Sequence, residues 1–595
     1  MNRLFLIGAA IWLGAGCGGS PSPEPEPEPI SDAGFDVDTT PPPDVDNPQA
    51  QLAVARLFPA GDPVARTVAC AWASPQLHRA DDGEQVIVTS GERVAAFETD
   101  SGTPLWDFVL PAPDGEMAYV TGTPLKHEQL LVVAYHTTAR TDEARDVGTR
   151  RLRHLVAVVD LDTHQLSALF PETLELSAVV PASDGEGDVQ FRPSNALARS
   201  DVTRGFEAGD TYGRAYVTFG NARDIQPWHG WAFEVDLDAW ADSGVDTAQA
   251  AVFLVTPESD CGPAGQSGSR ERICGGGLWA PSGQLIVQRD GDYDVILASG
   301  NGQLDLARRD YANTLMKAGP GLDYTDGCDA EACTGFNPDE PDRACADSCE
   351  NLFIPRMPRD EPYPVPEDGV CDGLTMYECW QKKDYVGGST PAYAEIGDKK
   401  VLLYPTKDGA LYMMDADHLG TYYDRVQLAA ICGTREDRCA LDWAGMIISQ
   451  PVVTAVGDDV VVITPTFVPD ATHPAGIVAV KLVIQDGEPR FAPYWQVPRF
   501  DTAEAIKRFR RHPSRVALGS YEGVDVAWVV EVNKGGKGRL MGIRVWDGTL
   551  LIDQEMNGSG TRFTVPLVYD DKVIVSSCPS DFGPSWLEAY RVTLE

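Results

Sequence analysis

The amino-acid sequence predicts an all-β protein, a β-propeller of about eight four-stranded blades. Short apolar runs rich in β-branched residues recur along the chain, turns containing Gly or Asp separate them at regular spacing, and helical patterns are few. The recurring unit spans roughly forty residues or more and holds about four strands, as a propeller blade does. A single four-stranded sheet cannot bury both of its faces, so the units are expected to close into a ring.

The first 17 residues predict export across a membrane. A positive charge at Arg3 precedes the apolar run 4–13, which is shorter than the ~20 residues of a spanning helix and typical of a signal peptide. The end of this run, Leu-Gly-Ala-Gly-Cys at 13–17, resembles a bacterial lipobox. The resemblance implies a lipid on Cys17 and, because Gly18 follows, an outer-membrane lipoprotein on the periplasmic or surface face. Ordinary cleavage near this point is the alternative.

Residues 18–50 predict an unfolded linker that follows the anchor. The segment begins with alternating Ser, Pro and Glu and continues rich in Asp and Pro. Proline restricts the backbone and like charges repel, so an extended stalk reaching ~90 Å is expected at ~3.1 Å per residue. No later stretch is apolar and long enough to span a membrane, so the lipid is the expected membrane contact.

Residues 51–595 are expected to form the propeller. The clearest repeats are 85–106 and 401–417, and looser copies lie around 130–170, 213–255, 284–317, 450–497, 515–556 and 565–595. The strand at 52–55 is expected to pair with the last blade, which ends at 587–592, and thereby close the ring. A net charge of −41 repels nucleic acid, so no nucleic-acid partner is expected.

The cysteine count is consistent with an oxidising compartment. Of 13 cysteines, removal of Cys17 leaves an even number, as a disulfide framework requires. We expect Cys70 to pair with Cys578 at the ring seam, Cys432 with Cys439, and Cys261 with Cys274. The insertion 326–381 holds six more, whose spacing and lack of His favour disulfides over the alternative of a zinc site, with connectivity left open: Cys328, Cys333, Cys345, Cys349, Cys371 and Cys379.

Four short segments resemble the pyrroloquinoline-quinone repeat of quinoprotein alcohol dehydrogenase-like propellers. They are Gly-Gly-Gly-Leu-Trp at 275–279, Ala-Ser-Gly-Asn-Gly at 298–302, Lys-Asp-Tyr-Val-Gly at 383–387 and Thr-Lys-Asp-Gly at 406–409. The likeness covers most of the chain after residue 80 and is strongest between 275 and 420. Within that family, the resemblance implies that Trp279 forms the floor under the quinone, Asn301 binds the metal, Asp384 is the catalytic base and Lys407 contacts the quinone oxygens.

Each of these residues also has a structural interpretation. Trp279 can pack between blades, Asn301 can serve a turn with positive φ, Lys407 can occupy a hairpin turn, and Asp384 can be a solvated loop acid. The family's vicinal cysteine pair is absent, and no counterpart of its metal-binding glutamate is found between 170 and 230. A Ca²⁺ site needs several oxygen ligands, so this loss weakens the enzyme hypothesis.

Three functions follow as hypotheses. The first is a lipid-anchored envelope propeller that binds another envelope protein as an assembly scaffold, like the outer-membrane assembly lipoprotein with a similar propeller. This function needs no cofactor. The second is an alcohol or sugar dehydrogenase dependent on pyrroloquinoline quinone and Ca²⁺. The third is a structural or adhesion module at the cell surface.

Overall fold

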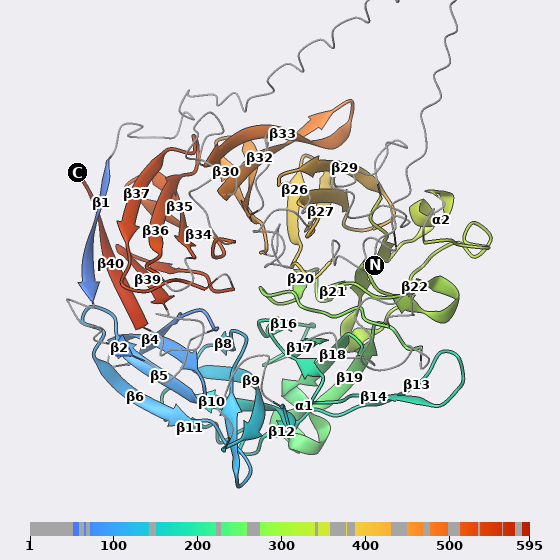
Figure 1. Cartoon of the computed structure of the whole chain (residues 1–595), viewed down its shortest axis with the longest axis horizontal. Coiled ribbons are helices and arrows are strands. Elements are labelled where there is room, and N and C mark those ends of the chain that lie inside the picture. The colour runs from blue at the N-terminus through green and yellow to red at the C-terminus, as the bar shows by residue number, and fades with distance from the viewer. Residues whose placement is uncertain are drawn as a thin grey trace, which may run out of the picture.

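The structure, a computed structural model, is a ring of antiparallel sheets around a central axis (Figure 1). The described residues are 51–58, 65–66, 72–81, 83–141, 150–221, 228–258, 274–338, 343–356, 377, 387–429, 449–467, 476–497, 512–532, 536–561, 563–577 and 586–595. Cys17, Cys70, Cys261, Cys371, Cys379, Asp384, Cys432, Cys439 and Cys578 lie outside them.

Eight sheets follow one another around the ring and form its blades. Blade one consists of β3 (Gln76–Ala80), β4 (Gly83–Ser90), β5 (Arg93–Glu98) and β6 (Pro104–Val109). Blade two consists of β7 (Glu116–Tyr119), β8 (Leu125–His127), β9 (Leu130–Ala139), β10 (Arg153–Asp160), β11 (Gln165–Leu166) and β12 (Leu174–Glu175). Blade three consists of β15 (Ala196–Leu197), β16 (Thr203–Gly205), β17 (Arg214–Asn221), β18 (Trp231–Asp236) and β19 (Gln249–Leu254). Blade four consists of β20 (Leu285–Gln288), β21 (Tyr293–Ala298), β24 (Leu315–Ala318) and β25 (Leu352–Phe353).

The second half of the ring is more regular. Blade five consists of β26 (Ala392–Ile396), β27 (Lys399–Pro405), β28 (Ala410–Asp415) and β29 (Tyr422–Gln427). Blade six consists of β30 (Val452–Val456), β31 (Asp459–Thr466), β32 (Gly476–Gln485) and β33 (Glu488–Val497). Blade seven consists of β34 (Ala517–Tyr521), β35 (Val524–Glu531), β36 (Arg539–Arg544) and β37 (Leu550–Glu555). Blade eight consists of β38 (Leu567–Tyr569), β39 (Lys572–Ser577), β40 (Trp586–Leu594) and β1 (Leu52–Phe58), and the short β2 (Ala65–Arg66) also pairs with β40.

The two ends of the propeller meet in blade eight. Strand β1 pairs antiparallel with β40, so that Leu52 lies opposite Leu594 and Val54 opposite Val592. Figure 1 shows the two strands side by side at the edge of the ring. The sequence prediction of this closure is therefore confirmed, and the first strand of the domain completes the last sheet.

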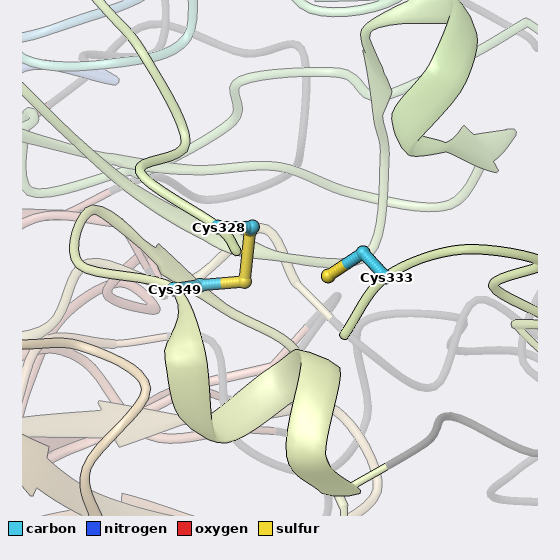
Figure 2. A group of neighbouring side chains, drawn as sticks. All are labelled: Cys328, Cys333 and Cys349. Carbon is cyan, nitrogen blue, oxygen red and sulfur yellow. A yellow bond between two sulfur atoms is a disulfide. The ribbon is translucent and has the colours of Figure 1, made fainter. Parts of the chain in front are cut away.

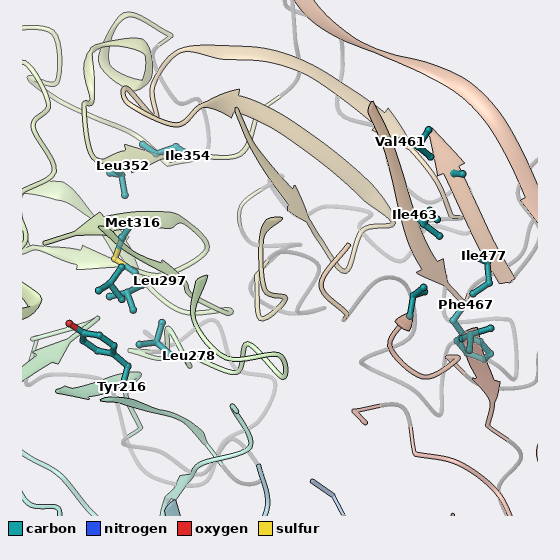
Figure 3. Close-up of a cluster of buried hydrophobic side chains, with 14 of the residues drawn as sticks. Tyr216, Leu278, Leu297, Met316, Leu352, Ile354, Val461, Ile463, Phe467 and Ile477 are labelled. Atoms are coloured by element: carbon teal, nitrogen blue, oxygen red, sulfur yellow. The ribbon is translucent and has the colours of Figure 1, made fainter. Parts of the chain in front are cut away.

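Apolar side chains fill every contact between neighbouring blades. The clusters join blade one to two, two to three, four to five, five to six, seven to eight and eight to one. A further cluster joins blades three and four and also blades six and seven, and Figure 3 shows its two groups of side chains, one around Leu297 and one around Ile463. Each sheet thus buries both faces against its neighbours, which is the reason the chain closes into a ring.

Strand direction distinguishes two ends of the axis. The first strand of each blade lies nearest the axis, as β16, β20, β30 and β34 do in Figure 1. We call the end at which these strands begin the upper end, and the end at which they finish the lower end. Because β38, β39, β40 and β1 alternate in direction, β1 begins at the lower end.

Helices are short and lie between strands. Those whose bounds fall within the described ranges are α1 (Leu237–Ser243), α2 (Arg343–Ser348), and the 3-10 turns η1 (Val245–Thr247), η2 (Leu306–Arg308) and η3 (Pro320–Leu322). Within the described ranges, none has the length and apolar character needed to cross a bilayer. Two small hairpins, β13 (Val179–Pro181) with β14 (Asp188–Gln190) and β22 (Leu304–Asp305) with β23 (Asp310–Tyr311), lie between the blade strands.

The cysteine-rich insertion contains two disulfides. Cys328 is bonded to Cys349 and Cys333 to Cys345, and Figure 2 shows the first pair with Cys333 beside it. The Sγ atoms of Cys328, Cys333 and Cys349 lie within 4.8 Å of one another. Each is bonded in a disulfide, so none of them is a thiolate that could bind a metal. Disulfides were the favoured interpretation of the insertion and are confirmed at these four positions. Cys274 is also disulfide-bonded, and its predicted partner Cys261 lies outside the described residues.

Candidate functional site at the upper end of the ring

Trp279 lies between blades three and five. It precedes β20, is partly exposed, and packs against the backbone of Gly220 at the end of β17, where a Cβ would overlap the indole ring. On its other side, a Cβ at Gly388 would lie 3.4 Å from the indole. The predicted packing of Trp279 between blades is therefore present, and part of its surface is exposed at the upper end.

Lys407 lies in the turn between β27 and β28 and is only 1% exposed. The turn is a hairpin in which Gly409 has φ of 82° and its N–H donates a 3.0 Å hydrogen bond to Thr406 O. The Lys407 side chain extends toward Gly388, where a Cβ would lie 3.3 Å from Nζ. Lys407 thus occupies a hairpin turn and also lies near Trp279, because the side chains of Lys407 and Trp279 both contact Gly388.

Asn301 lies in the turn that follows β21, but its φ is not positive, so the interpretation of Asn301 as a positive-φ turn residue is wrong. Its carbonyl accepts a 2.8 Å hydrogen bond from Gly276 N–H, which ties this turn to the glycine-rich segment before Trp279. The structure therefore brings the segments of Trp279, Asn301 and Lys407 to one end of the axis. Asp384, the predicted base, lies outside the described residues, and Gly387 is the first described residue after it.

Asp408, next to Lys407, is fully buried and belongs to blade five. Its Oδ2 accepts hydrogen bonds from Tyr412 and Arg425 at 3.3 Å each. Burial and this carboxylate raise the pKa of the Tyr412 phenol. Asp408 thus joins the turn between β27 and β28 to side chains of β28 and β29.

A circuit of polar contacts crosses the axis near the upper end. Arg515 N–H donates to Thr564 O at 3.1 Å, and Val565 N–H donates to Ser74 Oγ at 3.0 Å. Ser74 N–H donates to Thr123 Oγ1 at 3.0 Å. These three contacts join blades seven, eight, one and two.

Asp201 closes the circuit. Thr123 N–H donates to its Oδ1 at 2.7 Å, and Arg515 forms a salt bridge with its Oδ2. Asp201 belongs to blade three and Arg515 to blade seven, which are opposite each other in an eight-membered ring. Burial raises the pKa of Asp201, while the Arg515 charge opposes the shift. The pair is therefore a buried connection across the axis.

The sequence alone does not predict this circuit. The available signal was a Ser or Thr before Pro at the start of several first strands, as in Ser74-Pro75, Thr123-Pro124 and Thr390-Pro391. Thr390 links neighbouring blades in the same way in the other half of the ring, where Ser282 N–H of blade four donates to Thr390 Oγ1 of blade five at 3.2 Å. The opposition of Asp201 and Arg515 depends on ring closure and has no signal in the local sequence.

The described residues suit the quinone better than they suit its metal ion. Trp279 offers an aromatic surface and Lys407 a cation nearby, which suit a planar anionic quinone. A Ca²⁺ ion needs 6–8 oxygen ligands. Among the described residues, three or more His, Cys, Asp or Glu side chains come close enough to share a metal ion at the cysteine cluster of the insertion. No such cluster of carboxylates lies beside Asn301 within the described ranges. The described part of the chain therefore does not supply a calcium site.

These features define the class of the protein as an eight-bladed β-propeller, and the architecture predicted from the quinoprotein-like repeats is confirmed. No protein-family model matches the chain. Similar solved structures include a quinohemoprotein alcohol dehydrogenase from Pseudomonas putida HK5, at 12% identity over 91% of this chain and 76% of that one, with a TM-score of 0.49.

Two further solved structures resemble the chain. A europium-containing methanol dehydrogenase is 11% identical over 91% of this chain and 93% of that one, with a TM-score of 0.48. BamB from Moraxella catarrhalis is 10% identical over 91% of this chain and 97% of that one, with a TM-score of 0.36. At these identities and scores, the likenesses carry no argument about activity, which has to come from the site itself.

Proposed function

We propose that this chain is a binding or assembly scaffold of the bacterial envelope, held by a lipid on Cys17 and the linker 18–50. Its upper end binds another envelope protein. The observation that carries the proposal is that charged groups of the ring pair with one another, Asp201 with Arg515 beside the axis and Asp408 with Arg425 within blade five. These charges stabilise the ring, and a rigid ring is suited to present a fixed surface to a partner.

Strand direction supports the choice of the upper end. Strand β1 begins at the lower end, so a chain anchored through the residues before β1 would enter the ring at that end. The upper end, with the partly exposed Trp279, faces away from the attachment point. Tryptophan is enriched where protein interfaces contribute most binding energy.

Site-specific photocrosslinking in intact envelopes tests the scaffold. A photoreactive residue replaces exposed Arg192 at the upper end or, as the matched control, exposed Glu128 at the lower end. We expect a recurrent crosslinked partner from position 192 and none from position 128. Equal crosslinking from both ends, or none from either, would contradict the assignment of the upper end.

A second candidate is the dehydrogenase dependent on pyrroloquinoline quinone and Ca²⁺. It is favoured by one observation, the convergence of Trp279 and Lys407 on Gly388. In this function the quinone would stack on Trp279 and its oxygens would contact Lys407, while Asn301 and Asp384 would serve the metal and the proton transfer.

A titration of the full chain with pyrroloquinoline quinone and Ca²⁺ separates the two functions. The scaffold predicts no saturable quinone absorbance and no dye reduction with an alcohol or sugar. Saturable binding that is lost in Trp279→Leu and Lys407→Ala, with turnover lost in Asp384→Ala, would establish the dehydrogenase instead.

A further inference from the structure

The outermost strand of blade one, β6, has an exposed apolar side. Its Trp106 and Phe108 pack against the core between blades one and two, whereas Leu105, Asp107 and Val109 are exposed. Leu105 is 49% exposed and Val109 44%, which is high for large apolar side chains. We call Leu105, Asp107 and Val109 the blade-one edge. Figure 1 shows β6 on the outside of the ring, away from the axis and the upper-end site.

The pairing register directs one side of the β6 backbone away from the ring. Leu110 N–H donates to Glu92 O at 2.8 Å, which makes these two residues a hydrogen-bonded pair at the end of the ladder between β5 and β6. Bonded and non-bonded pairs alternate along an antiparallel ladder. Val109 and Asp107, which lies opposite Ala95, are therefore at non-bonded positions, and their N–H and C=O groups point away from β5. Among the described residues, none makes a hydrogen bond with these outward groups.

The outer strands of two other blades are reached by an arginine of the next blade. On β37 of blade seven, the carbonyl of Glu555 accepts a 2.5 Å hydrogen bond from Arg56 of β1. On β29 of blade five, the carbonyl of Tyr423 accepts a hydrogen bond from Arg490 of β33. Folded proteins usually cover an edge strand or place charge along it, because its free backbone groups pair with other strands. The blade-one edge instead combines free backbone groups with two exposed apolar side chains.

The free groups of β6 define the kind of partner that fits. A row of outward N–H and C=O groups is completed by another extended strand, whose backbone supplies the missing hydrogen bonds. Alternate side chains of that strand would then lie beside Leu105 and Val109, since successive residues of a strand point to opposite faces. A helix cannot complete the row, because its backbone groups are bonded within the helix.

Charge and composition favour a basic strand from another protein. The chain has a net charge of −41, so two copies repel each other. The segment 18–50 is also a poor occupant, because it is acidic and its many prolines have no N–H to donate. Asp107 pairs with Arg93 on β5, but both side chains are exposed, and such a pair is weak enough to be exchanged for a basic residue of a partner.

We propose that the blade-one edge binds an extended, basic β-strand of another protein, which pairs with β6 and continues the sheet of blade one outward. The bound strand would take hydrogen bonds from Asp107 and Val109 and cover Leu105 and Val109. This surface is separate from the upper end, so the inference goes beyond the scaffold function and stands without it.

Hydrogen exchange of the full chain at single-amide resolution tests the edge, with a synthetic peptide of alternating lysine and valine as the probe. In the chain alone, we expect the amides of Asp107 and Val109 to exchange freely and those of Trp106 and Phe108 to be protected. The peptide should slow exchange at Asp107 and Val109 by about tenfold or more. The same peptide with N-methylated amides should have no effect, because it lacks the donors of a strand edge.

Two variants of the edge should weaken peptide binding by about tenfold. Val109→Lys adds a repelling charge, and Asp107→Pro removes an outward donor without removing a hydrogen bond to β5. Ile484→Lys is the matched control, because Ile484 is 46% exposed on another blade and its replacement should leave binding unchanged.

Several results would overturn the proposal. Slow exchange at Asp107 and Val109 in the chain alone would show that the edge is already covered, by a second copy if the protection rises with concentration and by the chain itself if it does not. No slowing by the peptide, equal slowing by the N-methylated peptide, or equal binding by Val109→Lys and Ile484→Lys would each rule out strand addition at this edge.

Discussion

At the scale of residues, the buried salt bridge between Arg515 and Asp201 determines how firmly opposite blades are joined. Arg515→Met leaves the Asp201 carboxylate buried without its counter-charge, and we expect a loss of about 3 kcal/mol in the free energy of unfolding. Denaturant unfolding measures it. Arg515→Lys, which keeps the charge, should lose less, and equal stability of Arg515→Met and the parent chain would show that the bridge is not structural.

Asp310 gives a second residue-scale prediction, on pH. Burial raises the pKa of its carboxyl to about 8, although the Glu258 N–H, 3.2 Å away, favours the charged form. A folded-state pKa above the unfolded value means that stability falls as pH rises from about 4 to about 8. Asp310→Asn should flatten the stability profile over that range in thermal unfolding. Asp290→Asn, an exposed control, should leave the slope unchanged, and a parallel loss of slope in both variants would contradict the assignment.

At the scale of elements, the disulfide between Cys333 and Cys345 closes a short loop of the insertion. The two cysteines are 12 residues apart, and removal of a disulfide of this loop size costs about 3 kcal/mol. We expect Cys333→Ser with Cys345→Ser to release this loop while the blades remain folded, which limited proteolysis with mass spectrometry detects. Cleavage spread through blades five to eight would show instead that the insertion is needed for the ring.

The elements also show what the sequence could predict. The two apolar runs of 401–417, separated by a Lys-Asp-Gly turn, correctly predict β27 and β28, and the run at 52–55 correctly predicts the closing strand, because both depend on local pattern and on the need to cover sheet faces. The opposition of Asp201 and Arg515 depends on how the closed ring sets blade three against blade seven. The repeats predict about eight blades, but no local pattern says which side chains meet across the axis, so this contact could not be predicted.

At the scale of the whole molecule, ring closure depends on one pair of strands from opposite ends of the chain. Proline at Ala53 would remove a backbone donor from β1 where it faces Thr593 of β40, because the hydrogen bond from Glu595 N–H to Gln51 O makes 53 and 593 a hydrogen-bonded pair of the antiparallel register. Because proline at such a position breaks the ladder, we expect Ala53→Pro to destabilise blade eight and loosen both of its neighbours.

Hydrogen exchange followed by mass spectrometry tests the closed ring most directly. A closed ring predicts strong protection of peptides covering 52–58 and 586–594 in the parent chain, and loss of protection in both peptides together in Ala53→Pro. Exchange of 52–58 at the rate of an unstructured peptide in the parent chain would contradict the closed propeller, and with it the placement of the upper-end site.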